Sequence, residues 1–199
     1  MSRARPLTRK DLLGRSIVAG GAVAAGGTLV GGLAAPAGSA PSPRQDAEIL
    51  NFALLIEYVL EGFYAAARAQ AGLTGELADF ARIVGDHERR HVEFLRSQLG
   101  GGARRRPRLD FGNAVAGPER FVATAIELED LTVVAYNGQA PNLTAGALAA
   151  AARIVSVEAR HAAWIRDLDG RNPAPLAADR PISAAAATRA LNRTGFVKG

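Results

Sequence analysis

The sequence predicts an all-α fold, a bundle of four helices in which two antiparallel hairpins are joined by a long crossover. Three observations carry this prediction. From Gln45 onward, apolar residues recur every three to four positions, and alternating strand patterns are nearly absent. Four such segments follow one another, and the connections between them are short, long and short. The chain has 199 residues, enough for one domain with a sizeable core and a short appendage.

The first two segments form the first predicted hairpin. The stretch "DAEILNFALLIEYVLEGFYAAARAQA" places Leu50, Leu54 and Glu57 on one face, and it ends before Gly72. The second segment follows Thr74, a residue suited to cap a helix N-terminus, and it stops at the glycines of 100–102. Because the link between the two segments is so short, the helices must lie side by side and run in opposite directions.

The third and fourth segments form the second predicted hairpin. The third begins at Pro118, since proline is tolerated in a first helical turn, and the fourth follows Thr144, carries Leu148 on its apolar stripe and ends near Gly170. The link "GGGARRRPRLDFGNAVAG" (100–117) is long enough to cross the length of a bundle. We therefore assign the bundle to residues 43–170.

The two ends of the chain are predicted to lie outside the bundle. Residues 1–42 combine a basic start, a long Gly- and Ala-rich apolar run and a small-residue, proline-containing stretch near Ala40, as in an export signal followed by a linker. The motif "LTRKDLL" resembles a twin-arginine signal, with Arg9-Lys10 in place of two arginines. This predicts a protein of the periplasm, cell envelope or extracellular space, which meets the membrane only if the signal stays uncleaved. Residues 171–199 read as a tail with a short helix over 183–192, packed on the bundle or on a neighbouring subunit.

Composition excludes several classes of function. The net charge is +5, but much of this excess is local, at the start of the chain and at Arg104–Arg106. No basic stripe interleaves with aromatic residues, so no nucleic-acid partner is predicted. The chain has no cysteine, which removes disulfides, thiolate metal sites, iron–sulfur clusters and cysteine catalysis. Any metal must therefore be held by His, Asp or Glu.

The two halves of the predicted bundle repeat each other. The stretches "EYVLEGFY" (57–64) and "EDLTVVAY" (129–136) both separate a glutamate from a tyrosine by seven positions. Later in each half come "ERRH" (88–91) and "EARH" (158–161), each followed by an aromatic, an aliphatic residue and an arginine. The first and second glutamates of each half are 31 and 29 residues apart (88 − 57 and 158 − 129). A duplication that keeps these residues indicates that they act together.

Four of the repeated residues are carboxylates at positions where the helical period demands an apolar side chain: Glu57, Glu88, Glu129 and Glu158. Burying an unpaired carboxylate costs several kcal/mol, and four that converge also repel one another. The nearest cations, Arg89, Arg90 and Arg160, lie one or two positions from a glutamate and so point away from the core. Two divalent ions would balance the four charges, with His91 and His161 supplying one nitrogen each. The predicted metal ligands are thus Glu57, Glu88, His91, Glu129, Glu158 and His161.

This constellation resembles the ferritin-like di-iron carboxylate superfamily, over residues 46–170. Tyr64 is placed as in ferritins, and Trp164, three residues after His161, as in bacterioferritins. The wording "QDAEILNFALLIEYVLEGFY" is most similar to exported ferritin-like proteins grouped with desiccation-related proteins. The resemblance implies that Glu88 and Glu158 bridge two iron (or manganese) ions. It also implies oxidation of Fe(II) with O₂ or peroxide, and it leaves assembly into a homo-oligomer open.

Two other functions remain as alternatives. One is a non-enzymatic protein of the envelope that stores metal or protects against stress or desiccation. The other is a zinc metalloprotease, because His87 to His91 spell H-E-x-x-H, in which Glu88 would be the general base. The extended protease motif fails, since Phe94 and Ser97 occupy its Gly and third-His positions. That alternative also leaves the second Glu-x-x-His unexplained.

Other residues near the predicted ligands are assigned different positions or roles. Glu127 competes with Glu129 but lies about 200° round the helix from it. Glu61 shares the face of Glu57 and stays an alternative or supporting ligand. Tyr64 and Tyr136 are interpreted as core tyrosines. His87 is placed outside the ligand set, on the helix surface or behind a ligand.

Overall fold

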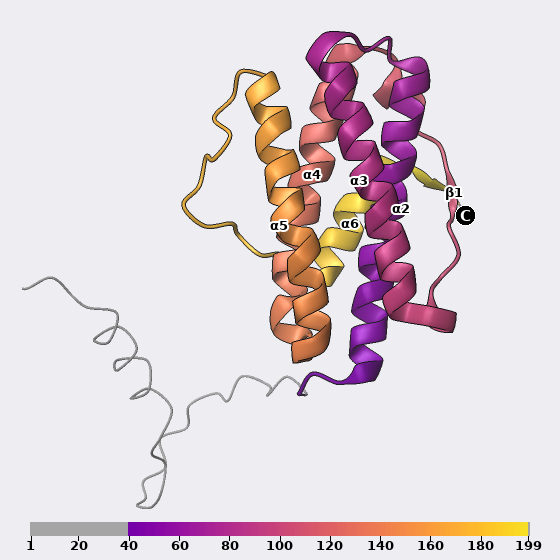
Figure 1. Ribbon diagram of the computed structural model, residues 1–199, viewed down its shortest axis with the longest axis vertical. Helices are drawn as coiled ribbons and strands as arrows, with labels where there is room; N and C mark the ends of the chain where they lie inside the picture. Colours follow the sequence, from indigo (N-terminus) through magenta and orange to yellow (C-terminus); the bar gives the residue numbers. More distant parts are fainter. Residues whose placement is uncertain (1–39, 199) are drawn as a thin grey trace, which may run out of the picture. The chain divides into compact units, whose positions relative to one another are not determined.

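Four long helices build the part of the chain that the structure, a computed structural model, describes, namely residues 40–198. They are α2 (Pro43–Gln70), α3 (Gly75–Leu99), α4 (Pro118–Gln139) and α5 (Ala145–Leu168). The helices pair as α2 with α3 and α4 with α5 (Figure 1). The expected all-α bundle is confirmed. The predicted export signal falls almost entirely on residues 1–39, which lie outside the described part.

The crossover between the hairpins runs along the bundle, so that α4 starts at the end of the bundle where α3 starts (Figure 1). It contains two 3₁₀ turns, η1 (Gly100–Gly102) and η2 (Gly112–Val115), and between them the short strand β1 (Arg108–Leu109). A third turn, η3 (Ala140–Asn142), closes the second hairpin. This path makes α3 and α4 parallel, and it brings Glu88 of α3 close to Glu129 of α4.

Of the four long helices, only α2 begins with a side-chain cap. Ser42 caps α2 by accepting a hydrogen bond from the Gln45 amide (3.3 Å), and Pro43 occupies the first turn. Thr74 precedes α3 as expected, although its hydroxyl makes no capping bond. Asp46 in the first turn of α2 accepts hydrogen bonds from the amide (2.9 Å) and hydroxyl (2.6 Å) of Thr144. This last contact ties the start of α5 to the start of α2.

Apolar packing accounts for the hydropathy of α2. One 18-residue window of this helix has a mean hydropathy of 1.4, enough for a membrane span, but 67% of that window is buried inside the bundle. Phe63, Tyr64, Phe80 and Phe121 form an aromatic centre of the core between α2, α3 and α4. Leu148, predicted on the buried stripe of α5, is instead 39% exposed, since it lies in the first turn at one end of the bundle.

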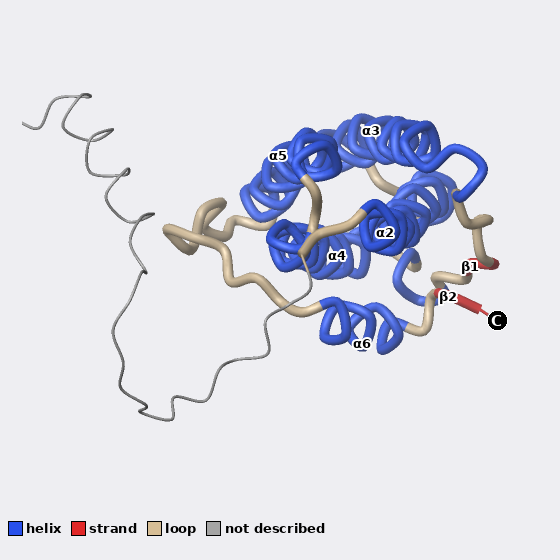
Figure 2. Tube along the Cα trace, turned by 90° about the horizontal axis from the view of Figure 1, so that it is seen from below, coloured by secondary structure: helices blue, strands red, loops and turns tan. Residues whose placement is uncertain are grey.

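The C-terminal tail packs on its own bundle. Its helix α6 (Ala184–Thr194) is capped by Ser183 and buries Ala187 and Leu191. Figure 2 shows α6 beside α4, on the side away from α3 and α5. The strand β2 (Val197–Lys198) then pairs with β1 in an antiparallel ladder. The sequence did not predict this pairing, because strands of two residues carry no readable alternation.

The tail is held where its backbone meets α4 without an intervening side chain. The Ile182 amide donates to the Val134 carbonyl (3.2 Å), and a Cβ added to Gly138 would lie 1.7 Å from the Ile182 carbonyl oxygen. We expect Gly138→Ala to push this segment off α4 and to lower the free energy of unfolding by about 1–3 kcal/mol. Thermal unfolding measures the loss, and faster proteolysis of residues 171–183 locates it.

Gly146 in α5 provides the matched control. A Cβ there would meet nothing within 4 Å, so Gly146→Ala should leave stability unchanged or raise it by at most about 1 kcal/mol. Equal melting temperatures for the two variants would show that the tail does not depend on the contact at Gly138.

Candidate metal centre

The six side chains that the sequence pattern singles out meet in the middle of the bundle, one or two from each long helix. Their ligand atoms fall into two groups, and within each group all of them lie within 4.8 Å of one another. We call the group Glu57, Glu88, His91 and Glu158 site 1, and the group Glu88, Glu129, Glu158 and His161 site 2. Glu88 and Glu158 belong to both.

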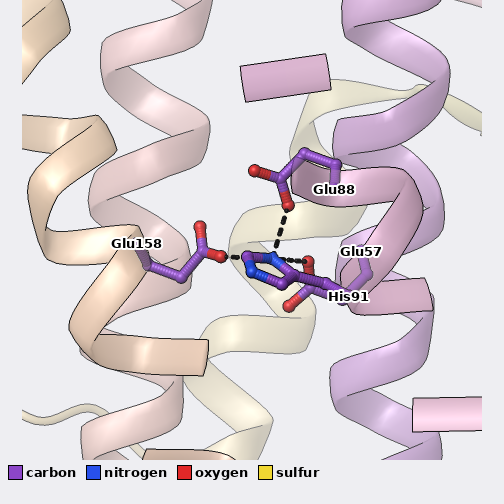
Figure 3. Close-up of side chains that lie close together, drawn as sticks. All are labelled: Glu57, Glu88, His91 and Glu158. Carbon is purple, nitrogen blue, oxygen red and sulfur yellow. Dashed lines mark hydrogen bonds and ion pairs between the residues drawn. The ribbon is translucent and has the colours of Figure 1, made fainter. Parts of the chain in front are cut away.

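Site 1 is arranged around one imidazole nitrogen (Figure 3). The Nδ1 atom of His91 lies 2.8 Å from Glu158 Oε1, 3.1 Å from Glu88 Oε2 and 3.4 Å from Glu57 Oε2. Ligand atoms that bind one ion at about 2.1 Å and at right angles are themselves about 3 Å apart. The spacing of site 1 therefore suits four atoms that share an ion.

Site 2 repeats this arrangement with the other oxygens of the shared carboxylates. The Nδ1 atom of His161 lies 3.0 Å from Glu88 Oε1, 3.6 Å from Glu158 Oε2 and 3.7 Å from Glu129 Oε2. Glu88 and Glu158 thus each turn one oxygen toward His91 and the other toward His161. A carboxylate placed in this way can bridge two ions, one in each site.

The carboxylates are completely buried, and within residues 40–198 no arginine or lysine forms an ion pair with them. Arg89, Arg90 and Arg160 are exposed, as their positions on the helices predicted. In the same part of the chain, six buried ligand atoms make no hydrogen bond: Glu57 Oε2, Glu88 Oε1, Glu129 Oε2, both oxygens of Glu158 and His161 Nδ1. Orphaned carboxylate and imidazole atoms that face one another fit a pair of divalent metal ions.

Comparison with known protein families identifies the fold that carries these sites. The family profile for the ferritin-like domain matches residues 45–171, which include all six side chains. The chain belongs to the ferritin-like family. No curated protein matches the sequence. The matched residues run from the first turn of α2 to just beyond α5.

Two tyrosines form hydrogen bonds with Glu57 and Glu129, which we call the outer carboxylates because each belongs to one site only. Tyr136 of α4 donates a hydrogen bond to Glu57 Oε1 of α2 (2.5 Å), and Tyr64 of α2 donates to Glu129 Oε1 of α4. Each bond leaves the Oε2 atom of its glutamate facing a site. Burial raises the pKa of both hydroxyls well above the usual value, and the nearby carboxylates raise it further, so both stay protonated donors. The repeated spacing of glutamate and tyrosine was the sequence signal for this role.

Buried carboxylates and histidines in the two sites shift one another's pKa values. Burial lowers the pKa of His161, but the three carboxylates that face its Nδ1 atom outweigh burial and raise the pKa to about 12. The pKa of His91 is raised for the same reason. Burial raises the pKa of Glu129 to about 7 and that of Glu88 well above its usual range. Burial alone would raise the pKa of Glu158, but the two neighbouring histidines, His91 and His161, hold it at about 2. Metal must therefore displace protons in order to bind.

Three neighbouring residues stay outside both sites. Glu61 forms an ion pair with Arg106 of the crossover (2.5 Å), and Glu127 is exposed. His87 is absent from both groups, and its Nδ1 lies 2.9 Å from Nε2 of His161. Of the two places expected for His87, the structure has the one behind a ligand. The letters H-E-x-x-H therefore do not assemble as one set of ligands.

Proposed function

We propose that the ferritin-like domain binds two iron ions, one in site 1 and one in site 2, and oxidises Fe(II) with O₂ or peroxide. Manganese is the alternative metal, because carboxylate and imidazole ligands suit both ions. The observation that carries the proposal is the set of six buried ligand atoms without hydrogen bonds. Glu88 and Glu158 would bridge the ions, Glu57 and Glu129 would each bind one, and His91 and His161 would complete sites 1 and 2.

Charge balance supports two ions rather than one. The four carboxylates carry four negative charges once they are all deprotonated, and protons on the two histidines would compensate only two of them. In the metal-free protein the raised pKa values of Glu88 and Glu129 reduce this excess by protonation. Two divalent ions compensate all four and leave the histidines neutral, the form in which imidazole binds metal. The anionic oxygen ligands also favour the more highly charged Fe(III), as oxidation requires.

Two bound iron ions would supply the redox chemistry, with one electron passing from each Fe(II) to the oxidant. The protein itself would hold the two ions in place and shield them from water. The tyrosine hydroxyls fix the outer carboxylates, and burial keeps bulk water away. Only the histidines keep some contact with the surface, with 11% of the His91 side chain and 4% of the His161 side chain exposed. Such a centre admits small oxidants rather than bulky organic substrates.

Anaerobic loading with Fe(II) and subsequent mixing with O₂ or hydrogen peroxide test the proposal. We expect two ions per chain and an oxidation rate well above that of Fe(II) in buffer, measured by the absorbance of Fe(III). Two ions with oxidation no faster than in buffer would support the non-enzymatic alternative, storage of metal or protection under stress. Fewer than one bound ion, with manganese as well as iron, would reject the two-metal centre.

We further propose that the protein is exported, on the strength of residues 1–42 alone. Exchange of Arg9 and Lys10 for glutamine should retain the protein in the cytoplasm, as cell fractionation would measure. Unaltered export of that variant would rule out a twin-arginine route.

A further inference from the structure

The two sites differ in what lies behind their histidines. His161 in site 2 has His87 as a neighbour, with Nε2 and Nδ1 2.9 Å apart and the two rings 5.1 Å apart at an angle of 21°. For His91 in site 1, the described residues offer no side-chain hydrogen bond to the Nε2 atom. The same contrast holds for exposure, since more of the His91 side chain than of the His161 side chain reaches the surface.

The duplication shows why only one site has this neighbour. His87 directly precedes Glu88 in α3, and the corresponding residue before Glu158 in α5 is Val157. Valine has no hydrogen-bonding side chain, so the position of the second half that corresponds to His87 cannot support a histidine in the same way. The halves therefore share their six ligands but not this supporting residue.

We propose that His87 is a positioning residue that orients His161, so that site 2 holds its ion more tightly than site 1. The inference rests on the proposed two-metal function and adds to it an order of binding. The ion in site 2 is the resident one, and the ion in site 1 is the one that exchanges with solution.

The hydrogen bond defines how this works. An ion on Nδ1 of His161 leaves the ring proton on Nε2, which points at His87. His87 accepts that proton's hydrogen bond on Nδ1 and keeps its own proton on Nε2. A partner of this kind fixes the tautomer and the orientation of a metal-binding histidine and makes its nitrogen a better ligand. Among the described residues, no such partner orients the ring of His91.

Titration of the full chain with Co(II), followed by visible absorption, separates the two sites. Glu57→Ala weakens site 1 and leaves site 2 to be measured, and Glu129→Ala does the reverse. Adding His87→Leu should weaken binding about 10–100-fold in the Glu57→Ala background, the usual effect of losing such a partner. In the Glu129→Ala background it should leave the affinity unchanged. A merely structural role of His87 would weaken both backgrounds alike.

Two further variants sharpen the test. His87→Gln restores a hydrogen-bond acceptor and should recover the affinity and absorption spectrum of site 2, and Val157→His should tighten site 1. The proposal would be overturned if His87→Leu weakened metal binding equally in the two backgrounds, or in neither. If His87→Leu does not fold, Val157→His decides instead, and an unchanged affinity of site 1 in that variant would overturn the proposal. A wild-type chain that binds no Co(II), Fe(II) or Mn(II) would instead reject the proposed function itself.

Discussion

Replacement of Glu88 or Glu158 by alanine is expected to remove both metal ions from the protein at a metal concentration at which the wild type holds two. Under the same conditions Glu57→Ala or Glu129→Ala is expected to retain one. The difference follows from the oxygens of the shared carboxylates, one of which faces each site. An outer carboxylate faces one site only, since its second oxygen accepts a tyrosine hydrogen bond.

The size of the effect can be estimated from the charge that is lost. Removing one partner from a buried, charged cluster costs about 3–5 kcal/mol, and 3 kcal/mol corresponds to a roughly hundredfold weaker affinity. For Glu88→Ala this loss applies to both sites, and for Glu57→Ala it applies to site 1 alone. Equilibrium dialysis against Co(II), followed by elemental analysis, measures the number of ions retained.

Glu127→Ala is the matched control, because Glu127 is an exposed glutamate two positions from Glu129. It should retain two ions. Circular dichroism of the metal-free variants separates lost binding from lost folding. We expect the variants to fold, because removal of one buried carboxylate also removes repulsion. Should Glu88→Ala and Glu57→Ala retain the same number of ions, the assignment of Glu88 as a shared ligand would be wrong.

The side of each helix that faces the core could be predicted from the sequence, because the helical period fixes which side chains lie on that side. Thr74, Pro118 and Thr144 marked the starts of three helices, and the structure begins those helices at or directly after them. The duplication then distinguished Glu129 from Glu127, a choice that the buried and exposed positions of the two side chains support. Local pattern was sufficient for these features.

The convergence of the six ligands could be predicted from the duplication, but the hydrogen-bond partners of individual side chains on different helices could not. The bond from Tyr136 to Glu57, like that between His87 and His161, joins residues more than 70 positions apart in the chain. Which side chain meets which depends on the rotation and relative height of the packed helices, and no single helix encodes these. The ladder of β1 and β2 was missed for a related reason, since its two-residue strands are defined only by each other.

Metal-free protein is expected to lose stability as the pH rises from 5.5 to 8, and bound metal is expected to reverse this trend. With its pKa at about 7 instead of the ordinary 4.5, Glu129 keeps a proton in the folded state that the unfolded chain has released. His161, at about 12 instead of 6.5, does the same above pH 6.5. The folded state thus binds more protons, and its free energy of unfolding falls by at most about 1.4 kcal/mol per pH unit for each. Glu158 has the opposite sign, but its stabilisation is lost only as the pH falls from 4.5 towards 2, outside this range.

Bound metal acts in the other direction because it replaces those protons. Its affinity rises with pH, since the ligands must be deprotonated. At a free metal concentration of about 100 times the Kd, each site adds about 2.7 kcal/mol, so two sites raise the melting temperature by roughly 10–20 °C in a chain of this size. Thermal unfolding at pH 5.5 and pH 8, with Co(II) and with a chelator, measures both trends. Glu88→Ala, which weakens both sites, should show little of the metal-dependent shift. A shift that is no larger at pH 8 than at pH 5.5 would mean that metal and protons do not compete for these carboxylates and histidines.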